Sequence, residues 1–356
     1  MPPPSGGTRA SVNDAPESIL RGATPAAGLA LAAFAVPPRF EAATFASYLP
    51  DPAYPSQAAA VGRLRRAVSE PQPSQGSWLA RWRKSPAPTW QGVYLDGGFG
   101  VGKTHLLAAA YHAFDGPRAY LSFQDLTYVV GALGMLATLE LFGQARLICL
   151  DEFELDDPGN TMLATSFVAG AVARGARLII TSNTLPAELG QGRFSAAAFE
   201  REIGQLAAVF ESLPIEGNDY RHRRYAPDAR LPRLLPAAAA PPGALAWPAL
   251  LEQLAMLHPI HYVELVELLD ELCLRDVMPI EEQDAALRFV HFIDKLYDRC
   301  RPLTLCSDYR LAELFPPSYG YGGFQRKFRR CQSRLHETLS EPLLTVAETY
   351  DAADGA

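Results

Sequence analysis

A glycine-rich segment constrains the fold of this chain more than any other feature. Residues 97–107 read GGFGVGKTHLL, after the apolar run VYLD and before AAAYHAF. Glycines are entropically costly unless the backbone must turn sharply or approach another group closely. A glycine cluster between a strand and a helix predicts a loop whose backbone N–H groups close around an anion, most naturally a phosphate.

The segment from Gly97 to Thr104 matches the phosphate-binding pattern G-x-x-x-x-G-K-T without deviation. In this pattern we expect Lys103 to reach the β- and γ-phosphates and the Thr104 hydroxyl to bind Mg²⁺. The alternative is a glycine-rich turn with a surface lysine, which the strand before it and the helix after it disfavour. We therefore predict ATP and Mg²⁺ as cofactors. The predicted nucleotide-binding residues are Gly97, Gly98, Phe99, Gly100, Val101, Gly102, Lys103, Thr104 and His105.

Apolar, β-branched runs recur along the chain, with helical stretches between them. They are GVYLDG (92–97), RAYLSF (118–123), RLICLDEF (146–153), RLIITSN (177–183) and the weaker VFESLPI (209–215). Continuous apolar runs that alternate with helices are typical of parallel strands buried on both faces. The pattern predicts an α/β fold, a parallel sheet flanked by helices.

Two carboxylates follow the third of these runs directly. Asp151 and Glu152 would lie at the carboxyl end of a buried strand, where open α/β sheets bind ligands. We expect Asp151 to hold magnesium and Glu152 to act as the general base for an attacking water. The nearby Glu154, Asp156 and Asp157 are predicted to form a solvated helix start instead.

The run RLIITSN ends in Thr181, Ser182 and Asn183. In a parallel sheet this strand is expected beside the strand of Asp151, so that Asn183 could orient the water near the γ-phosphate. The alternative is an ordinary polar exit from a strand. Further upstream, YPSQ (54–57) leaves two interpretations open: Gln57 reads the adenine base, or Ser56 caps a helix.

Composition narrows the class of protein. With 48% hydrophobic and 20% charged residues, the chain reads as a soluble globular protein, and its net charge of -7 disfavours an extensive nucleic-acid-binding surface. Its five cysteines include no C-x-x-C pair, which indicates reduced thiols and a cytoplasmic location. The run AAGLALAAFAV (26–36) is like a signal-peptide core but too short to span a membrane, and we expect a short helix there.

These motifs together resemble AAA+ ATPases, in which Asn183 would be the sensor-1 residue. Further segments resemble the ZapE-type cell-division ATPases and their mitochondrial relatives over residues 37–337. They are LDEFELDD, TSNTLPAELG, DYRHR, LRFVHFIDKLYDR and FQRKFRRCQSRLHE. The resemblance implies a homo-oligomeric ATPase of AAA+ type whose client is the tubulin-like division-ring protein or a membrane-associated protein.

The resemblance also implies an arginine that reaches the γ-phosphate of a neighbouring subunit. Arg193 matches the family position best, and Arg201, eight residues later, is the competitor. A guanidinium suits this role because its planar fork matches phosphate oxygens and stabilises charge on the transferred group.

The last basic helix offers further arginines. Either Arg326 or Arg334 could face the nucleotide as a sensor-2 residue, whereas Arg329 and Arg330 are predicted to point to water. The positive charge of this helix is also compatible with nucleic acid, although the net charge of the chain makes nucleic acid the less favoured partner.

The domain organisation follows from shifts in composition. We predict a disordered tail (1–25), an ATPase domain with a helical lead-in (26–225), a Pro/Ala-rich connector (226–248), a mainly helical, lid-like C-terminal domain (249–345) and a frayed tail (346–356). In the family that the chain resembles, DYR is followed by a longer insertion that contains strands. Here Pro- and Ala-rich sequence occupies much of that interval, which leaves partner recognition open.

Three functions remain in competition at this stage. The first is an ATPase that couples turnover to remodelling of a protein partner. The second is a helicase loader acting on a nucleic-acid machine, and the third is a slow nucleotide switch or scaffold. The FIDKLYDR and SRLHE segments favour the first over the loader, and Glu152 disfavours the scaffold.

Overall fold

The computed structural model describes residues 30–69, 92–98, 100–155, 158–184, 200–218, 231–320 and 324–353. The chain divides into two compact units. We call the described residues from 30 to 218 the N-terminal unit and those from 231 to 353 the C-terminal unit, and describe each by itself.

The N-terminal unit is built on a five-stranded parallel sheet with the order β2-β3-β4-β1-β5. Its strands are β1 (Gly92–Gly97), β2 (Arg118–Ser122), β3 (Leu147–Asp151), β4 (Arg177–Ser182) and β5 (Phe210–Ile215). The five runs predicted from the sequence are these five strands, and the predicted α/β fold is confirmed. The strand of Asp151 pairs with the strand that leads to Asn183, as expected.

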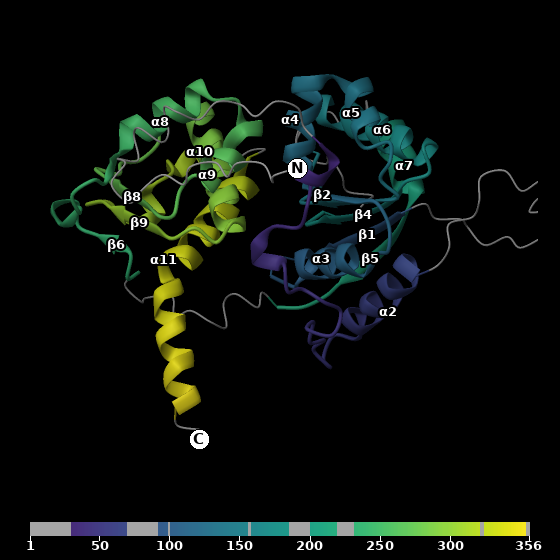
Figure 1. Cartoon of the computed structure of the whole chain (residues 1–356), viewed down its shortest axis with the longest axis horizontal. Helices are drawn as coiled ribbons and strands as arrows, with labels where there is room; N and C mark the ends of the chain where they lie inside the picture. The colour runs from purple at the N-terminus through teal and green to yellow at the C-terminus, as the bar shows by residue number, and fades with distance from the viewer. Residues whose placement is uncertain are drawn as a thin grey trace, which may run out of the picture. The chain divides into compact units, whose positions relative to one another are not determined.

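Helices cover both faces of this sheet (Figure 1). On one face lie α2 (Pro55–Ser69) and α3 (Lys103–Ala113), and on the other lie α4 (Phe123–Leu133), α5 (Met135–Leu141), α6 (Pro158–Ala173) and α7 (Glu200–Val209). Ahead of them come two short 3₁₀ turns, η1 (Leu31–Ala33) and η2 (Pro38–Phe40). The short helix expected at 26–36 is thus a single turn within the part that the structure describes.

The glycine loop follows β1, a strand in the interior of the sheet. Strand β1 pairs with β4 on one side and β5 on the other, and its Val93, Tyr94 and Leu95 are buried. Because all strands are parallel, the loop after β1 and the ends of β3 and β4 meet at one edge of the sheet.

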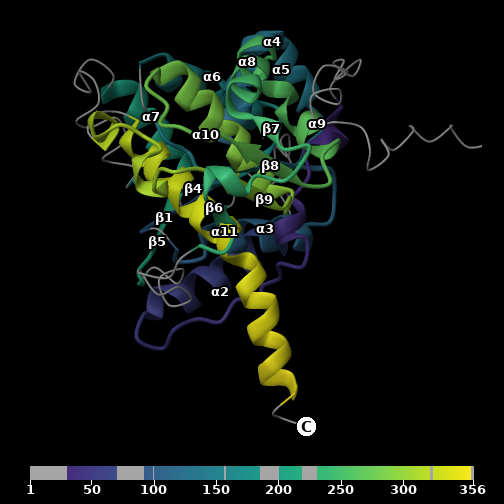
Figure 2. The same cartoon turned by 90° about the vertical axis from the view of Figure 1, so that its left-hand side faces the viewer.

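The C-terminal unit has a second parallel sheet, of short strands, with the order β6-β9-β8-β7. These are β6 (Leu234–Leu235), β7 (Leu245–Ala246), β8 (Leu272–Arg275) and β9 (Leu303–Cys306). The longer helices are α8 (Trp247–Met256), α9 (Tyr262–Glu267), α10 (Gln283–Asp298) and α11 (Gln325–Ala353), seen in Figure 2. Short 3₁₀ turns complete it: η7 (Ala237–Ala239), η8 (Pro259–His261), η9 (Leu311–Glu313) and η10 (Pro317–Gly320).

Two segments differ from the expected organisation. The predicted connector at 226–248 contains β6 and β7, which pair with β9 and β8, so its described residues belong to the second sheet. Strands of two residues carry no periodicity, and the surrounding prolines and alanines hide them in the sequence. Helix α11 continues to Ala353, through most of the expected tail. The predicted tail at 1–25 lies outside the described residues.

Candidate nucleotide-binding site

The glycine loop needs glycine at two positions because the backbone is close to other groups. A Cβ on Gly97 would lie 2.3 Å from the carbonyl oxygen of Ile215 in β5. Gly102 has a φ of 87°, in the left-handed region, and a Cβ there would lie 2.6 Å from the ring of Tyr48. Helix α3 begins at the next residue, so its free N–H groups point toward the loop, as an anion site requires.

Lys103 lies buried at the start of α3 and turns its ammonium group back toward the loop. Its Nζ donates to the carbonyl oxygens of Gly97 (2.9 Å) and Gly98 (2.6 Å) and to Oδ1 of Asn183 (2.9 Å). The structure therefore brings the predicted lysine and the predicted asparagine together, across the end of β4.

Asp151 is buried at the end of β3, with an exposed fraction of 6%. Its Oδ2 accepts from the Tyr120 hydroxyl (2.9 Å), and its Oδ1 accepts from Thr104 Oγ1 (3.3 Å) and from Thr181 Oγ1. The two residues predicted to hold magnesium thus lie in contact. A hydroxyl and a carboxylate are hard oxygen ligands, and Mg²⁺ in nucleotide sites usually takes only one or two protein ligands besides phosphates, so the donor set fits this ion.

Glu152 has a backbone conformation that side chains rarely adopt, with a φ of 56°. Its N–H donates to Oδ1 of Asp151 (3.1 Å) and to Oγ1 of Thr181 (3.0 Å), which hold the turn in place. A non-glycine residue in the left-handed region costs roughly 1–3 kcal/mol and is concentrated at functional sites. The turn directs the chain away from the strand direction directly after Asp151, the carboxylate that is predicted to hold magnesium.

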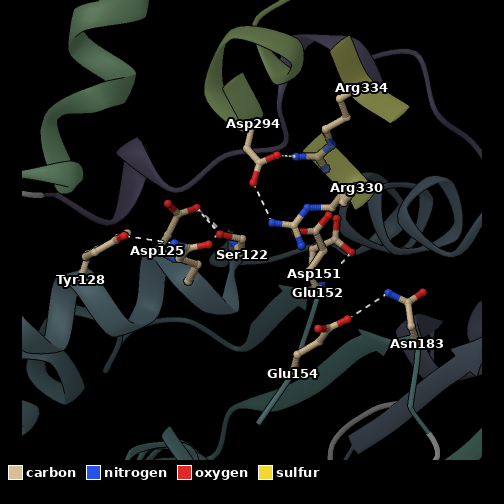
Figure 3. A network of polar contacts seen from close by, with 11 residues as sticks. Ser122, Asp125, Tyr128, Asp151, Glu152, Glu154, Asn183, Asp294, Arg330 and Arg334 are labelled. Carbon is tan, nitrogen blue, oxygen red and sulfur yellow. Dashed lines mark hydrogen bonds and ion pairs between the residues drawn. The ribbon is translucent and has the colours of Figure 1, made fainter. Parts of the chain in front are cut away.

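Glu154 contradicts the prediction that it belongs to a solvated helix start. It is buried, with an exposed fraction of 5%, and its Oε1 accepts from Nδ2 of Asn183 at 3.1 Å. Figure 3 shows this contact at the end of the sheet. The reversed turn at Glu152 and the burial of Phe153 and Leu155 carry Glu154 inward. Asp156 and Asp157 lie outside the described residues.

Hydrogen bonds to the residues around Asn183 also fix the end of β4. The hydroxyl of Tyr94, in the neighbouring strand β1, donates to the Thr184 carbonyl at 2.7 Å, and Thr184 N–H donates to Ser182 Oγ at 3.1 Å. These contacts hold the backbone on either side of Asn183.

A segment before α2 holds the helix-side end of the loop. The Tyr48 hydroxyl donates to the Val101 carbonyl at 3.0 Å, and burial raises the pKa of Tyr48 to about 12. The Nε2 of His105 lies 3.0 Å from Ser47 Oγ and 3.1 Å from the Thr44 carbonyl. The His105 imidazole therefore faces this segment, so the prediction that His105 contacts a nucleotide now concerns its backbone N–H alone.

Neither interpretation of Ser56 and Gln57 agrees with the structure. Helix α2 already begins at Pro55, and Ser56 Oγ accepts from the Glu216 N–H at 3.1 Å, so it does not cap the helix. The Gln57 amide is buried and joins Asp51 N–H (2.8 Å) to the Glu216 carbonyl (2.9 Å), so both of its polar atoms bind backbone, not a base.

Asp96, directly before the loop, is a buried acid that the sequence analysis did not single out. Its Oδ1 accepts from Ser212 Oγ at 2.6 Å. Burial raises the pKa of Asp96, while the Ser212 hydroxyl, its own backbone N–H and the charge of Lys103 lower it in part. This acid ties the root of the loop to β5.

The structure describes some of the predicted arginines and not others. Arg193 and the loop residue Phe99 lie outside the described residues, and Arg201 lies near the start of α7. In α11, Arg329 is exposed as expected. Arg330 is not: it is buried, and its Nη2 lies 2.7 Å from Oδ2 of Asp294 in α10.

Arg334 joins the same ion cluster, and Figure 3 shows both arginines directed at Asp294. Its Nη1 lies 2.5 Å from Oδ1 of Asp294, and its guanidinium lies over the Tyr297 ring. This arginine therefore holds α11 against α10. Its role as a nucleotide sensor, like that of Arg326, stays a prediction.

The sequence analysis missed Tyr120 as a partner of Asp151 and gave Thr181 no separate role. Both contacts depend on the register of the sheet. Tyr120 pairs with Cys149, two residues before Asp151, and Thr181 comes directly after the last residue of β4 that pairs with β3. Their signal in the sequence is a polar group near the end of an otherwise apolar strand.

The sheet order, the glycine loop after β1, the acidic pair after β3 and the asparagine after β4 define a P-loop NTPase of the AAA+ class. The chain belongs to the AFG1-like ATPase family, whose profile matches residues 24–234 and 231–346. The predicted family resemblance is thereby confirmed.

The chain is also similar in sequence to individual curated proteins. The chain is 26% identical over 303 residues to the cell division protein ZapE of Escherichia coli K12, an alignment that covers 71% of this chain and 79% of that protein. It is 27% identical over 164 residues to Lactation elevated protein 1 homolog B of Danio rerio, covering 40% of this chain and 33% of that one.

Among solved structures, the DnaC helicase loader matches with a TM-score of 0.37 and 21% identity, over 50% of this chain and 99% of that one. DnaI matches with a TM-score of 0.40 and 19% identity, over 51% of this chain and 93% of that one.

Among the described helices, none is both long and apolar enough to cross a bilayer.

Proposed function

We propose that this chain binds ATP with Mg²⁺, hydrolyses it, and uses the turnover to remodel a protein partner. The observation that carries the proposal is the contact between Thr104 and Asp151, which brings a hydroxyl from the phosphate loop to a carboxylate at the end of β3. These two oxygen donors would hold a magnesium ion, with Lys103 on the other side of the loop to bind the β- and γ-phosphates.

Hydrolysis would then follow from the residues around this pair. A water molecule attacks the γ-phosphorus, the bond to the β,γ-bridging oxygen breaks, and the proton of the water passes to the Glu152 carboxylate. Lys103 and the N–H groups of the loop stabilise the charge on the phosphate oxygens. ADP and phosphate are released.

The cell-division setting rests on likeness to ZapE, a relative whose name states that process, and the partner rests on the family resemblance given in the sequence analysis. We propose a cytoplasmic homo-oligomer whose client is the tubulin-like protein of the division ring. The test measures ATP turnover alone, with polymerised division-ring protein, and with single-stranded DNA. Stimulation by the polymer supports the proposal. Stimulation by DNA alone would favour a helicase loader, and no turnover in any arm would favour a nucleotide switch.

Oligomeric action is tested by mixing two inactive variants. If Arg193 completes a neighbouring subunit's site, Arg193→Ala and Lys103→Ala proteins should each be inactive and recover part of the activity when mixed. Each Lys103→Ala subunit still offers an arginine to an Arg193→Ala neighbour whose loop works. No recovery, despite mixed assembly by light scattering, would move the role to Arg201.

A further inference from the structure

We infer that Glu154 is a positioning residue that fixes the orientation of the Asn183 amide, so that this amide presents its oxygen, and not its NH₂ group, to the nucleotide site. The inference deepens the proposed hydrolysis and rests on it for its catalytic consequence. Its structural content concerns three side chains, Lys103, Asn183 and Glu154, that form a continuous polar relay.

The chemistry of the two outer groups leaves one arrangement for the amide between them. An ammonium group has only donors, and a carboxylate has only acceptors. An amide that bridges them must therefore turn its oxygen to Lys103 and its nitrogen to Glu154. The distances agree: 2.9 Å from Lys103 Nζ to Oδ1, and 3.1 Å from Nδ2 to Glu154 Oε1. The usual ambiguity between the two ends of an asparagine side chain does not arise here.

The surroundings of Glu154 make this orientation firm. Its exposed fraction is 5%, and Phe153 and Leu155 on either side are buried, so water competes little for the carboxylate. A buried hydrogen bond to a charged group is roughly twice as strong as a neutral one. The contacts from Tyr94 to Thr184 and from Thr184 to Ser182 fix the backbone on both sides of Asn183.

The catalytic consequence follows when Lys103 turns to the phosphates. Its contacts with Gly97, Gly98 and Asn183 are then given up, and the Asn183 oxygen is left facing the site. Phosphate oxygens only accept hydrogen bonds, so this oxygen cannot bind the γ-phosphate. It can accept a hydrogen bond from the attacking water and so turn the water's lone pair toward phosphorus, while the proton itself passes to Glu152. Asn183 would thus orient water, and Glu154 would keep it in that role.

The first test reads the relay directly in nucleotide-free protein, so it stands even if the chain proves unable to hydrolyse ATP. The chain has four asparagines, Asn13, Asn160, Asn183 and Asn218, so asparagine-selective ¹⁵N labelling gives four side-chain amide pairs. Asn183→Ala assigns one of them. We expect Glu154→Gln to shift that pair more than the other three, and Glu216→Gln, an exposed acid at the same edge of the sheet, to leave it unchanged. An Asn183 pair that does not respond to Glu154→Gln would overturn the inference.

The second test is a double-mutant cycle on turnover, with Glu154→Ala and Asn183→Ala. Loss of the carboxylate frees the amide to rotate, and we expect kcat to fall about 10-fold with a much smaller change in KM. In the Asn183→Ala background the same substitution should cost less than about twofold, because the group that it positions is already absent. Glu154→Gln, which retains an acceptor, should lose less than Glu154→Ala.

A purely structural role for Glu154 gives a different result. The two losses would then multiply, KM and the melting temperature would change with kcat, and Glu154→Gln would bring no recovery. Variants whose circular dichroism departs from that of the wild type are excluded from the cycle. In that case the ¹⁵N spectrum of the Glu154→Gln protein alone decides whether Glu154 positions Asn183.

Discussion

A buried aspartate of each unit, Asp151 in the N-terminal unit and Asp294 in the C-terminal unit, differs from the other in the partners of its carboxylate. Asp151, at the end of β3, has uncharged partners within the described part of the chain: three hydroxyls and a backbone N–H. Asp294, in the middle of α10, is paired with the guanidinium groups of Arg330 and Arg334. The exposed fractions are 6% and 5%, so burial does not distinguish them.

This difference in partners distinguishes a carboxylate that could bind a cation from one that is already paired with cations. Burial alone would raise the pKa of Asp294, but Arg330 and Arg334 outweigh it and hold the pKa below its usual range. Its charge is satisfied, and the cluster holds two helices together. Asp151 is oriented by neutral donors, and no guanidinium is among these partners. We therefore expect Asp151 to be the acid that takes part in binding, and Asp294 to serve the packing of α10 against α11.

The strongest test of this division replaces the acid beside Asp151. Glu152→Gln keeps the shape of the side chain and removes the base, so we expect kcat to fall by about 100- to 10,000-fold. Affinity for a fluorescent ATP analogue and the free energy of unfolding should stay close to wild type. Turnover within about twofold of wild type would mean that another residue activates the water, since that change is far below the range for a lost base.

The opposite substitution should affect folding and not chemistry. Asp294→Asn leaves two buried guanidinium groups without a counter-charge, and breaking a buried pair costs about 3–5 kcal/mol. Urea unfolding measures the loss. Asp284→Asn, at an exposed position in the same helix, is the matched control and should change stability by less than about 0.5 kcal/mol. Equal effects of the two substitutions would refute a structural role for the cluster.

Acid should remove the same contribution without any mutation. The folded-state pKa of Asp294 is depressed by Arg330, Arg334 and, to a smaller extent, His291, against the effect of burial. A depressed pKa stabilises the fold above the unfolded value of about 3.9, and this contribution is lost as the pH falls toward the folded value. The stability difference between wild type and Asp294→Asn should therefore shrink below about pH 4. A difference that stays constant from neutral to acidic pH would contradict the pairing.

The smallest effect is expected at the orienting hydroxyls of Asp151. Tyr120→Phe removes the donor to Oδ2 and leaves the ring packing unchanged. We expect the Mg²⁺ concentration for half-maximal turnover to rise several-fold, up to about 10-fold, as one hydrogen bond is worth about 1 kcal/mol. Tyr111→Phe, on the ring that packs edge-on against Tyr120, is the control. Equal shifts in both variants would assign the effect to packing.

Features that lie close together in the sequence were predictable, because their geometry is local. The loop from Gly97 to Thr104 and the acidic pair at 151–152 follow from strand–loop–helix spacing alone. Asn183 needed one further inference, that its strand pairs with the strand of Asp151, and parallel pairing supplied it.

Features that depend on distant partners were not predictable. Arg330 was expected in water, yet its partner Asp294 lies 36 positions earlier in another helix. Glu154 was assigned to a helix start because the reversal at Glu152 leaves no mark in the residue letters. Strands β6 and β7 are too short to show a period, so only their pairing with β9 and β8 reveals them.

The central position of β1 has a consequence for synthesis of the chain. Gly92 pairs with Leu178 on one side and with Phe210 on the other, so β1 has both of its neighbours only after β5 has been made, more than a hundred residues later. Such non-local pairing folds slowly and exposes strand edges meanwhile. A nascent chain that ends before β5 carries a complete glycine loop on a strand with one open edge, and lacks the Ile215 carbonyl against which Gly97 packs. We therefore expect the predicted nucleotide site to form only late in translation, after β5 has been made.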